Sequence, residues 1–145
     1  FIRQILHDQP GDETRWPVTL ELPDNPGEMI ADEATLRQAI ANMLSNARKY
    51  SPDGGIINVS VIPETEGRIG ICIHDHGMGM STEQLAHYGE RFWRADKSGV
   101  TPGTGLGVSI VAETMKLLGG SINVKSDAGE GTSVTLWLPA ASQLK

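Results

Sequence analysis

Apolar and polar residues alternate in five short stretches of the chain, a pattern typical of strands that bury one face. The alternating stretches cover residues 18–22, 57–61, 69–75, 122–124 and 134–138. Apolar residues at helical spacing indicate helices elsewhere. The helical stretches cover residues 32–49, 81–90 and 106–118.

Residues that start or stop helices stand at the ends of these stretches. Asp32 is a good N-cap, Ser81 with Gln84 forms a capping box, and Gly119-Gly120 supplies a C-terminal stop. The order is strand, helix, two strands, helix, loop, helix, two strands. Antiparallel hairpins combined with helices predict an α+β fold. We expect a two-layer α/β sandwich, in which three helices cover one face of a mixed, roughly five-stranded sheet.

The length of 145 residues fits one domain with a sizeable core. We expect residues 1–14 to be a stub or linker from a preceding helical domain, residues 15–140 to be the folded domain, and residues 141–145 to be a tail. The chain begins at Phe1 without a methionine, so we expect it to be a domain of a longer protein.

Charge and cysteine content narrow the class of partner. The net charge of −6 argues against a nucleic-acid surface, while local basic clusters at residues 48–49 and 91–97 suit a small anionic ligand. A single cysteine, Cys72, excludes an internal disulfide and favours a reducing compartment. The chain has no apolar run of transmembrane length and no signal peptide, which predicts a cytoplasmic domain.

Three polar residues share one flank of the first helix. Asn42, Asn46 and Lys49 follow the spacing i, i+4, i+7, whereas the apolar residues fall on another face. Two amide oxygens and one ammonium group in a row suit a hydrated Mg²⁺ and a chain of phosphates. The alternative is an ordinary solvated polar face.

Glycine motifs follow in the second half of the chain. Asp75-His76-Gly77-Met78-Gly79 comes directly after a predicted strand, where the carboxylate of Asp75 can accept a hydrogen bond from an exocyclic amine such as that of adenine. The two glycines permit a sharp turn and a close approach to a flat ring. The alternative is a simple glycine turn.

A second glycine motif, residues 103–107, opens the last helix, where free N–H groups and the helix dipole favour phosphate. It follows a loop and has the spacing G-x-G-x-G, so it is no Rossmann fingerprint, and the chain contains no P-loop motif. A third motif, Gly129-Glu130-Gly131-Thr132, is by itself a hairpin turn. We expect Thr132 to hydrogen-bond to Asp75 or to the adenine region.

The order of these motifs resembles the catalytic, ATP-binding domain of bacterial two-component sensor histidine kinases. That domain has the Bergerat fold of the GHKL ATPases, a superfamily shared with gyrase, the ninety-kilodalton heat-shock chaperones and the mismatch-repair ATPases. The resemblance covers about Val18 to Pro139. A fifth matching stretch, Glu90-Arg91-Phe92-Trp93-Arg94, lies between the first two glycine motifs. Each motif is short, but five in the same order are specific.

The resemblance implies a role for each matching residue. Asn42 and Asn46 would contact Mg²⁺ and phosphate, Lys49 would reach a phosphate, and Tyr50 would line the adenine pocket. Asp75 would bind the adenine amino group in a pocket shaped by Gly77 and Gly79. The remaining expected nucleotide contacts are Phe92, Arg94, Gly103, Thr104, Gly105, Leu106, Gly107 and Thr132. A lid over ATP would span residues 92–105.

The implied reaction is transfer of the γ-phosphoryl group of ATP to a histidine. Hydrolysing relatives place a Glu where this chain has Asn42, and a neutral amide is no general base, which favours the kinase over an ATPase. Alternatives are a true ATPase and a non-catalytic nucleotide-sensing or interaction module.

None of the four histidines of the chain has the context of a phosphoacceptor. We therefore expect the acceptor on a separate dimerisation domain, a response regulator as an indirect partner, and a monomeric fragment. The resemblance further implies that the parent protein lies in the bacterial inner membrane. His74 and His76 form an H-x-H pair, but no third metal ligand is visible.

Overall fold

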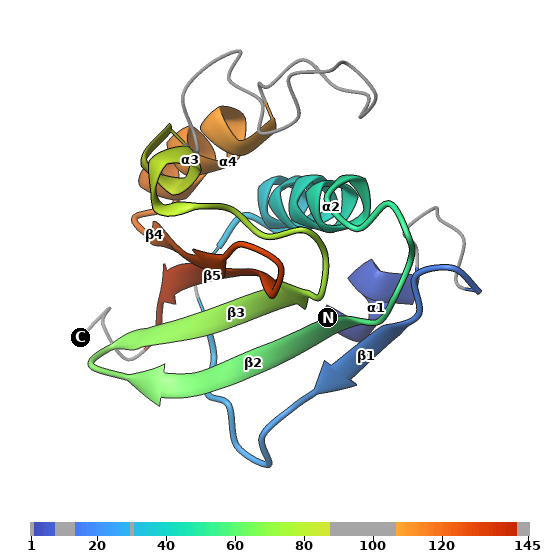
Figure 1. The fold of residues 1–145 in the computed structure, drawn as a ribbon. Coiled ribbons are helices and arrows are strands. Elements are labelled where there is room, and N and C mark those ends of the chain that lie inside the picture. The colour runs from blue at the N-terminus through green and yellow to red at the C-terminus, as the bar shows by residue number, and fades with distance from the viewer. Residues whose placement is uncertain (1, 8–13, 30, 88–106, 142–145) are drawn as a thin grey trace.

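The computed structural model describes residues 2–7, 14–29, 31–87 and 107–141, although not the side chains of residues 87 and 107–109. Within these ranges the chain forms helices and strands in the predicted order, preceded by one short helix (Figure 1). The elements are α1 (Ile2–His7), β1 (Val18–Glu21), α2 (Glu33–Lys49), β2 (Ile57–Thr65), β3 (Arg68–Asp75), α3 (Thr82–His87), α4 (Gly107–Leu117), β4 (Ser121–Asp127) and β5 (Gly131–Pro139).

The strands form one five-stranded sheet in the order β1-β2-β3-β5-β4. β1 pairs with β2 in parallel, and every other pair is antiparallel, so the sheet is mixed as predicted. The register between β2 and β3 shifts between Ile62 and Thr65, before the turn that joins the two strands.

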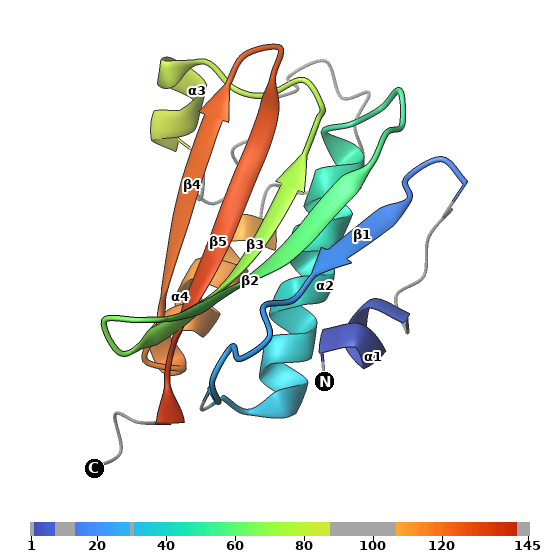
Figure 2. The ribbon, with the colours of Figure 1, turned by 90° about the horizontal axis from the view of Figure 1, so that it is seen from below.

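Helices cover one face of this sheet. α2 and α4 lie across it, α1 packs beside α2, and α3 sits near the end of β4 (Figure 1). Figure 2 looks onto the opposite face, which no helix of the described part of the chain covers. The main core lies between the two layers, where Ile40 and Leu44 of α2 are buried with Ile71 of β3 and Leu136 of β5. The predicted two-layer sandwich is confirmed.

The 17-residue helix α2 contributes buried apolar residues to the core and polar residues to the site described below. Its N-cap is Asp32, as predicted, and the side chain accepts a hydrogen bond from the N–H of Thr35 at 2.9 Å. Arg48 and Lys49 stand in its last turn, where positive charge complements the helix dipole. The helix ends near the C-terminal end of β3, the central strand of the sheet (Figure 2).

The other predicted helix ends are also observed. Ser81 and Gln84 exchange two hydrogen bonds at the start of α3, which makes the predicted capping box. Gly119, with a φ of +76°, ends α4, and the N–H of Gly120 donates to the carbonyl of Met115. No helix in the described ranges combines the length and the apolar character needed to cross a membrane.

Candidate functional site

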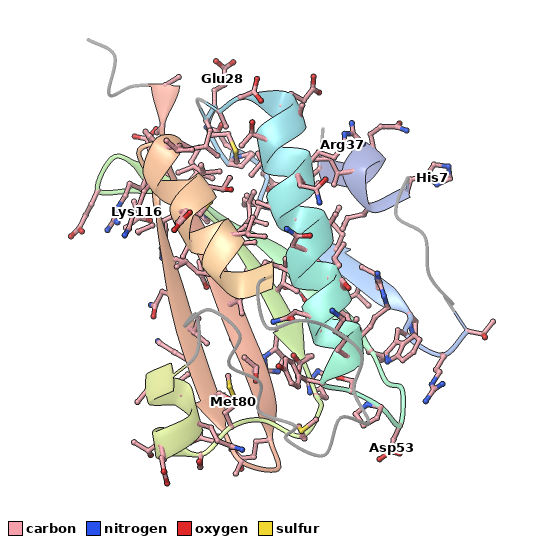
Figure 3. All side chains as sticks on the ribbon, turned by 90° about the horizontal axis from the view of Figure 1, so that it is seen from above. His7, Glu28, Arg37, Asp53, Met80 and Lys116 are labelled. Atoms are coloured by element: carbon pink, nitrogen blue, oxygen red, sulfur yellow. The ribbon has the colours of Figure 1, made fainter. Side chains whose placement is uncertain are left out.

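A narrow hollow lies between the C-terminal half of α2 and the adjacent ends of β3 and β5. Its lining combines five apolar side chains with four polar residues from α2, β3 and β5. The lining residues are Met43, Asn46, Ala47, Tyr50, Ile73, Asp75, Met80, Thr132 and Val134. Figure 3 shows Met80 at the same end of the molecule as Asp53, and Glu28 at the opposite end.

The cavity volume is about 10 Å³, which is room for roughly one water molecule. A planar base therefore enters only when wall side chains move. Met80 is suited to this because an unbranched thioether adapts its shape at low cost. The lining thus offers both apolar contacts and hydrogen-bonding groups to a ligand, although the hollow is nearly closed.

Asp75 is the buried carboxylate of this hollow. It is the last residue of β3 and its side chain is only 4% exposed. Its Oδ1 accepts hydrogen bonds from the N–H of Gly77 at 3.0 Å and from the N–H of Thr132 at 3.2 Å. No described residue donates to Oδ2. The carboxylate therefore keeps one oxygen for a further donor.

Burial dominates the electrostatics of this carboxylate. Removal from water raises the pKa of Asp75, while the N–H groups of Gly77 and Thr132 and the nearby rings of His74 and His76 act in the opposite direction. A buried acid with a raised pKa is typical of a functional position.

The expected bond between Thr132 and Asp75 is present, and the backbone N–H of Thr132 makes it. The side chain of Thr132 forms a different hydrogen bond, in which its Oγ1 lies 2.8 Å from the Oγ of Ser126 on β4. Ser126 in turn accepts from the N–H of Met80 at 2.8 Å and donates to the carbonyl of Gly131 at 2.9 Å.

The sequence analysis missed Ser126. One signal was available, because Ser126 stands at an inward position of β4, in phase with the half-buried Ile122 and Val124. A hydroxyl at an otherwise apolar inward position indicates a polar partner inside the fold.

The glycines of the two turns are needed for contacts between backbone segments. A Cβ at Gly77 would lie 1.9 Å from the carbonyl oxygen of Tyr50, and one at Gly79 would lie 2.0 Å from that of Asp127. A Cβ at Gly131 would lie 2.1 Å from the carbonyl oxygen of Asp75. The sharp turn predicted at Gly79 is present, with a φ of +65°. The close approach that these glycines permit is to the protein's own backbone.

Hydrogen bonds fasten the same segments together. The N–H of Met78 donates to the carbonyl of Tyr50 at 2.9 Å, and the N–H of Gly129 donates to the carbonyl of Met78 at 2.7 Å. The end of α2, the loop after β3 and the β4–β5 hairpin are therefore joined into one unit around Asp75. The hairpin turn predicted from the motif Gly129–Thr132 is observed at residues 128–130 and is part of this unit.

The polar flank of α2 reaches the hollow through Asn46. Asn42, one turn earlier, is half-buried and its Oδ1 accepts from the Nε2 of Gln38 at 3.2 Å. Lys49 is half-exposed in the last turn. Helical spacing places the three side chains on one flank, as expected, and of these three only Asn46 lines the hollow, beside Tyr50.

Comparison with known proteins agrees with this arrangement. Residues 31–142 match the family of histidine kinase-, DNA gyrase B- and HSP90-like ATPases. This chain belongs to that family. The sequence resemblance to sensor histidine kinases is confirmed.

Curated relatives include the sensor histidine kinase WalK of Bacillus subtilis, 36% identical over 121 residues that cover 81% of this chain and 20% of WalK. The sensor-like histidine kinase SenX3 of Mycolicibacterium smegmatis is 36% identical over 135 residues, 92% of this chain and 35% of SenX3. The chain thus spans only a minor part of the relatives it matches.

Solved structures give the same family. The mycobacterial sensor histidine kinase MprB superposes with a TM-score of 0.75 at 26% identity, covering 96% of this chain and 89% of that one. Full-length ShkA in complex with AMPPNP gives a TM-score of 0.81 at 26% identity, covering 97% of this chain and 29% of ShkA.

Part of the site expected of this ATPase domain lies outside the described residues. These positions are Phe92, Arg94, Gly103, Thr104, Gly105 and Leu106. Gly107 is described only as the first residue of α4. Their nucleotide contacts and the lid over residues 92–105 stay predictions.

Proposed function

We propose that this ATPase-family chain is the Mg-ATP-binding catalytic domain of a sensor histidine kinase. It would donate the γ-phosphoryl group of ATP to a histidine on a separate dimerisation domain. The observation that carries the proposal is the buried carboxylate of Asp75, whose Oδ1 is held by two backbone N–H groups while no described residue donates to Oδ2.

The base end of the site consists of Asp75, Thr132, Ser126 and the loop of residues 77–80. An ionised carboxylate that lacks one donor suits the amino group of adenine. Guanine carries a carbonyl oxygen at the corresponding position, and two acceptors facing each other in a buried site are unfavourable. The base end therefore favours ATP over GTP.

The phosphate end consists of Asn42, Asn46 and Lys49 on the flank of α2. Amide oxygens fit Mg²⁺, which takes oxygen ligands and keeps several waters, so both asparagines are candidate ligands. When bound, Mg²⁺ would neutralise the negative charge of the phosphates. Lys49 would add a compact positive charge at the same end.

The chemistry at Asn42 separates phosphoryl transfer from hydrolysis. A neutral amide cannot deprotonate water, whereas an imidazole nucleophile carries its lone pair at neutral pH without a base. This favours a histidine as acceptor. Residues 15–140 would form the catalytic domain and residues 1–14 the linker to the dimerisation domain. Residues 141–145 would form a tail, and the isolated domain would be monomeric.

In the longer parent protein, which would lie in the bacterial inner membrane with this domain in the cytoplasm, a response regulator would receive the phosphoryl group from the histidine. The family relatives named above as sensor kinases support this assignment.

Calorimetric titration with a non-hydrolysable ATP analogue, with and without Mg²⁺, tests the proposal. The wild type should bind saturably and more tightly with Mg²⁺, and Asp75→Ala should lose binding at least about a hundredfold because a buried polar contact is removed. Asp53→Ala removes an exposed carboxylate at the same end of the molecule and should bind like the wild type.

Absence of binding by a folded wild type would overturn the kinase assignment in favour of an interaction module. Steady ATP turnover by the chain alone, abolished by Asp75→Asn, would favour a true ATPase. Addition of the parent's helical domain should yield phosphohistidine, and its absence would contradict the proposed acceptor.

A further inference from the structure

A row of polar side chains crosses the open face of the sheet directly behind Asp75. The strand register aligns one residue from each strand in this row. From β1 to β4 the residues are Thr19, Asn58, His74, Ser133 and Lys125. This face lacks a helix in the described part of the chain (Figure 2).

Hydrogen bonds connect most of this row. The Nδ2 of Asn58 donates to the Oγ1 of Thr19 at 2.7 Å, and the Oδ1 of Asn58 lies 2.7 Å from the Nε2 of His76. The Nδ1 of His74 is hydrogen-bonded to the Oγ of Ser133. The rings of His74 and His76 meet edge to face, with centroids 4.5 Å apart. The two imidazoles therefore link β1 and β2 to β5.

The same backbone positions the carboxylate on the other face. His74 and His76 flank Asp75 in the sequence, and Gly77, which donates its N–H to Asp75, follows His76. Ser133, the partner of His74, follows Thr132, which donates the second N–H. Successive residues of a strand point to opposite faces, so the open-face network and the carboxylate share the same peptide units.

Few other ionisable groups face this pair. On the open face of the described strands they are Lys125 at the end of the same row, Asp127 further along β4, Glu21 and Cys72 in the next row, and Arg68 at the far end of β3, over the ring of Trp137. In the two rows nearest the imidazoles, β2 and β5 place only Asn58, Ser60, Ser133 and Thr135 on this face, and none of these is ionisable. Burial, together with His76, lowers the pKa of His74, while Asp75 raises it. His74 is thus held neutral near pH 7.

We propose that His74 and His76 are positioning residues for Asp75, and that protonation of this pair weakens recognition of the base. This inference rests on the proposed nucleotide function. With both rings charged, two like charges face each other at 4.5 Å. His76 is exposed and can turn away, which breaks its bond to Asn58 and loosens the turn that holds Asp75.

The direction with pH follows from the sign of the shift. Because the pKa of His74 lies below the ordinary value of 6.5, His74 stays neutral at neutral pH and becomes protonated only as the pH falls through that lowered pKa. Discrimination between adenine and guanine should fall over the same range.

The test compares an ATP analogue with the matching GTP analogue at pH 7.5 and pH 5.5 by calorimetry. The ratio of the two Kd values isolates the base, because both ligands carry the same titrating phosphates. For the wild type, we expect the Kd of the GTP analogue divided by the Kd of the ATP analogue to fall about tenfold from pH 7.5 to pH 5.5. A factor of this size is typical of the coupling between two sites. The double variant His74→Asn/His76→Gln keeps the hydrogen-bonding nitrogen positions and cannot titrate, so its ratio should change less than about twofold.

His7→Gln is the matched control, since His7 is an exposed histidine on α1, far from Met80 in Figure 3, and it should behave like the wild type. A double variant with lower discrimination at both pH values but the wild-type pH dependence would overturn the inference and leave a purely structural role. Should the double variant not fold, His76→Gln alone should lose most of the pH dependence. A wild type that binds neither analogue would instead overturn the proposed function itself.

Discussion

The two ends of the proposed nucleotide site differ in how firmly the protein itself holds them. At the base end, Asp75 is 4% exposed and bonded to two backbone N–H groups, and Ser126 links three further polar groups. At the phosphate end, Asn42 and Lys49 are partly exposed side chains on one helix flank. The base end is therefore part of the folded core, whereas the phosphate end is a surface that the ligand completes. Changes that add a clash or remove a hydrogen bond at the base end should alter stability and binding together, and changes at the phosphate end should alter binding alone.

The largest effect should come from Gly131→Ala at the base end. A Cβ there would lie 2.1 Å from the carbonyl oxygen of Asp75, at a φ of +104°. Because a backbone atom cannot move aside as a side chain can, we expect a loss of about 3 kcal/mol in the free energy of unfolding, measured by urea denaturation.

Gly129→Ala in the same hairpin is the matched control. Its φ is +83° but nothing lies within 4 Å of the added Cβ, so only the left-handed backbone costs energy, about 1 kcal/mol. Equal losses in the two variants would show that the contact with Asp75 is unimportant.

Ser126→Ala tests the hydrogen bonds that hold the base end together. The change leaves the N–H of Met80 and the Oγ1 of Thr132 without their partner, which should cost about 1–2 kcal/mol in the free energy of unfolding and weaken discrimination between ATP and GTP analogues. Ser121→Ala on the same strand removes an exposed hydroxyl and should cost less than about 0.5 kcal/mol. Unchanged discrimination in Ser126→Ala would place this serine outside the base end.

The sequence predicted these two ends unequally well. Helical spacing alone places Asn42, Asn46 and Lys49 on one flank, because the relation between residues four apart is local. The alternation of residues 69–75 likewise predicted β3, since its inward side chains pack against helices.

The sequence could not show why residue 131 must be a glycine, because its close contact is with the backbone of Asp75, far away along the chain. The parallel pairing of β1 with β2 was inaccessible for the same reason, although a mixed sheet was expected. Local patterns predict elements and side-chain stripes, whereas close packing between distant backbone segments emerges only in the fold.

Lys49→Met should change binding without changing stability. Loss of one ammonium group at the phosphate end should weaken the ATP analogue about tenfold, while the free energy of unfolding stays within about 0.5 kcal/mol. Affinity for adenosine should be unchanged in a calorimetric competition. Lys116→Met, on the exposed side of α4, is the control. An equal loss of adenosine affinity would contradict the separation of the two ends.

Asp75→Asn should change stability little, and without loss, although this is the residue on which base recognition depends. Burial raises the pKa of Asp75, so the folded state prefers the protonated acid and the ionised carboxylate destabilises it at neutral pH. Asparagine keeps an oxygen for the N–H groups of Gly77 and Thr132 without the charge. We expect the variant to be as stable as the wild type, or up to about 1 kcal/mol more stable, at pH 7.

The pH dependence of this difference has a definite sign. A raised pKa in the folded state means that the stability of the wild type falls as the pH rises above the ordinary value of 3.8 for an aspartate. Any advantage of Asp75→Asn should therefore shrink as the pH is lowered toward 4, which urea denaturation at pH 7 and pH 4 would measure. Because the charge of Asp75 raises the pKa of His74, the same comparison in a His74→Asn background removes the contribution of this imidazole. An Asp75→Asn variant that is clearly less stable at pH 7 would mean that the ionised carboxylate stabilises the fold. The charge at the base end would then have a structural role instead of a role in ligand binding.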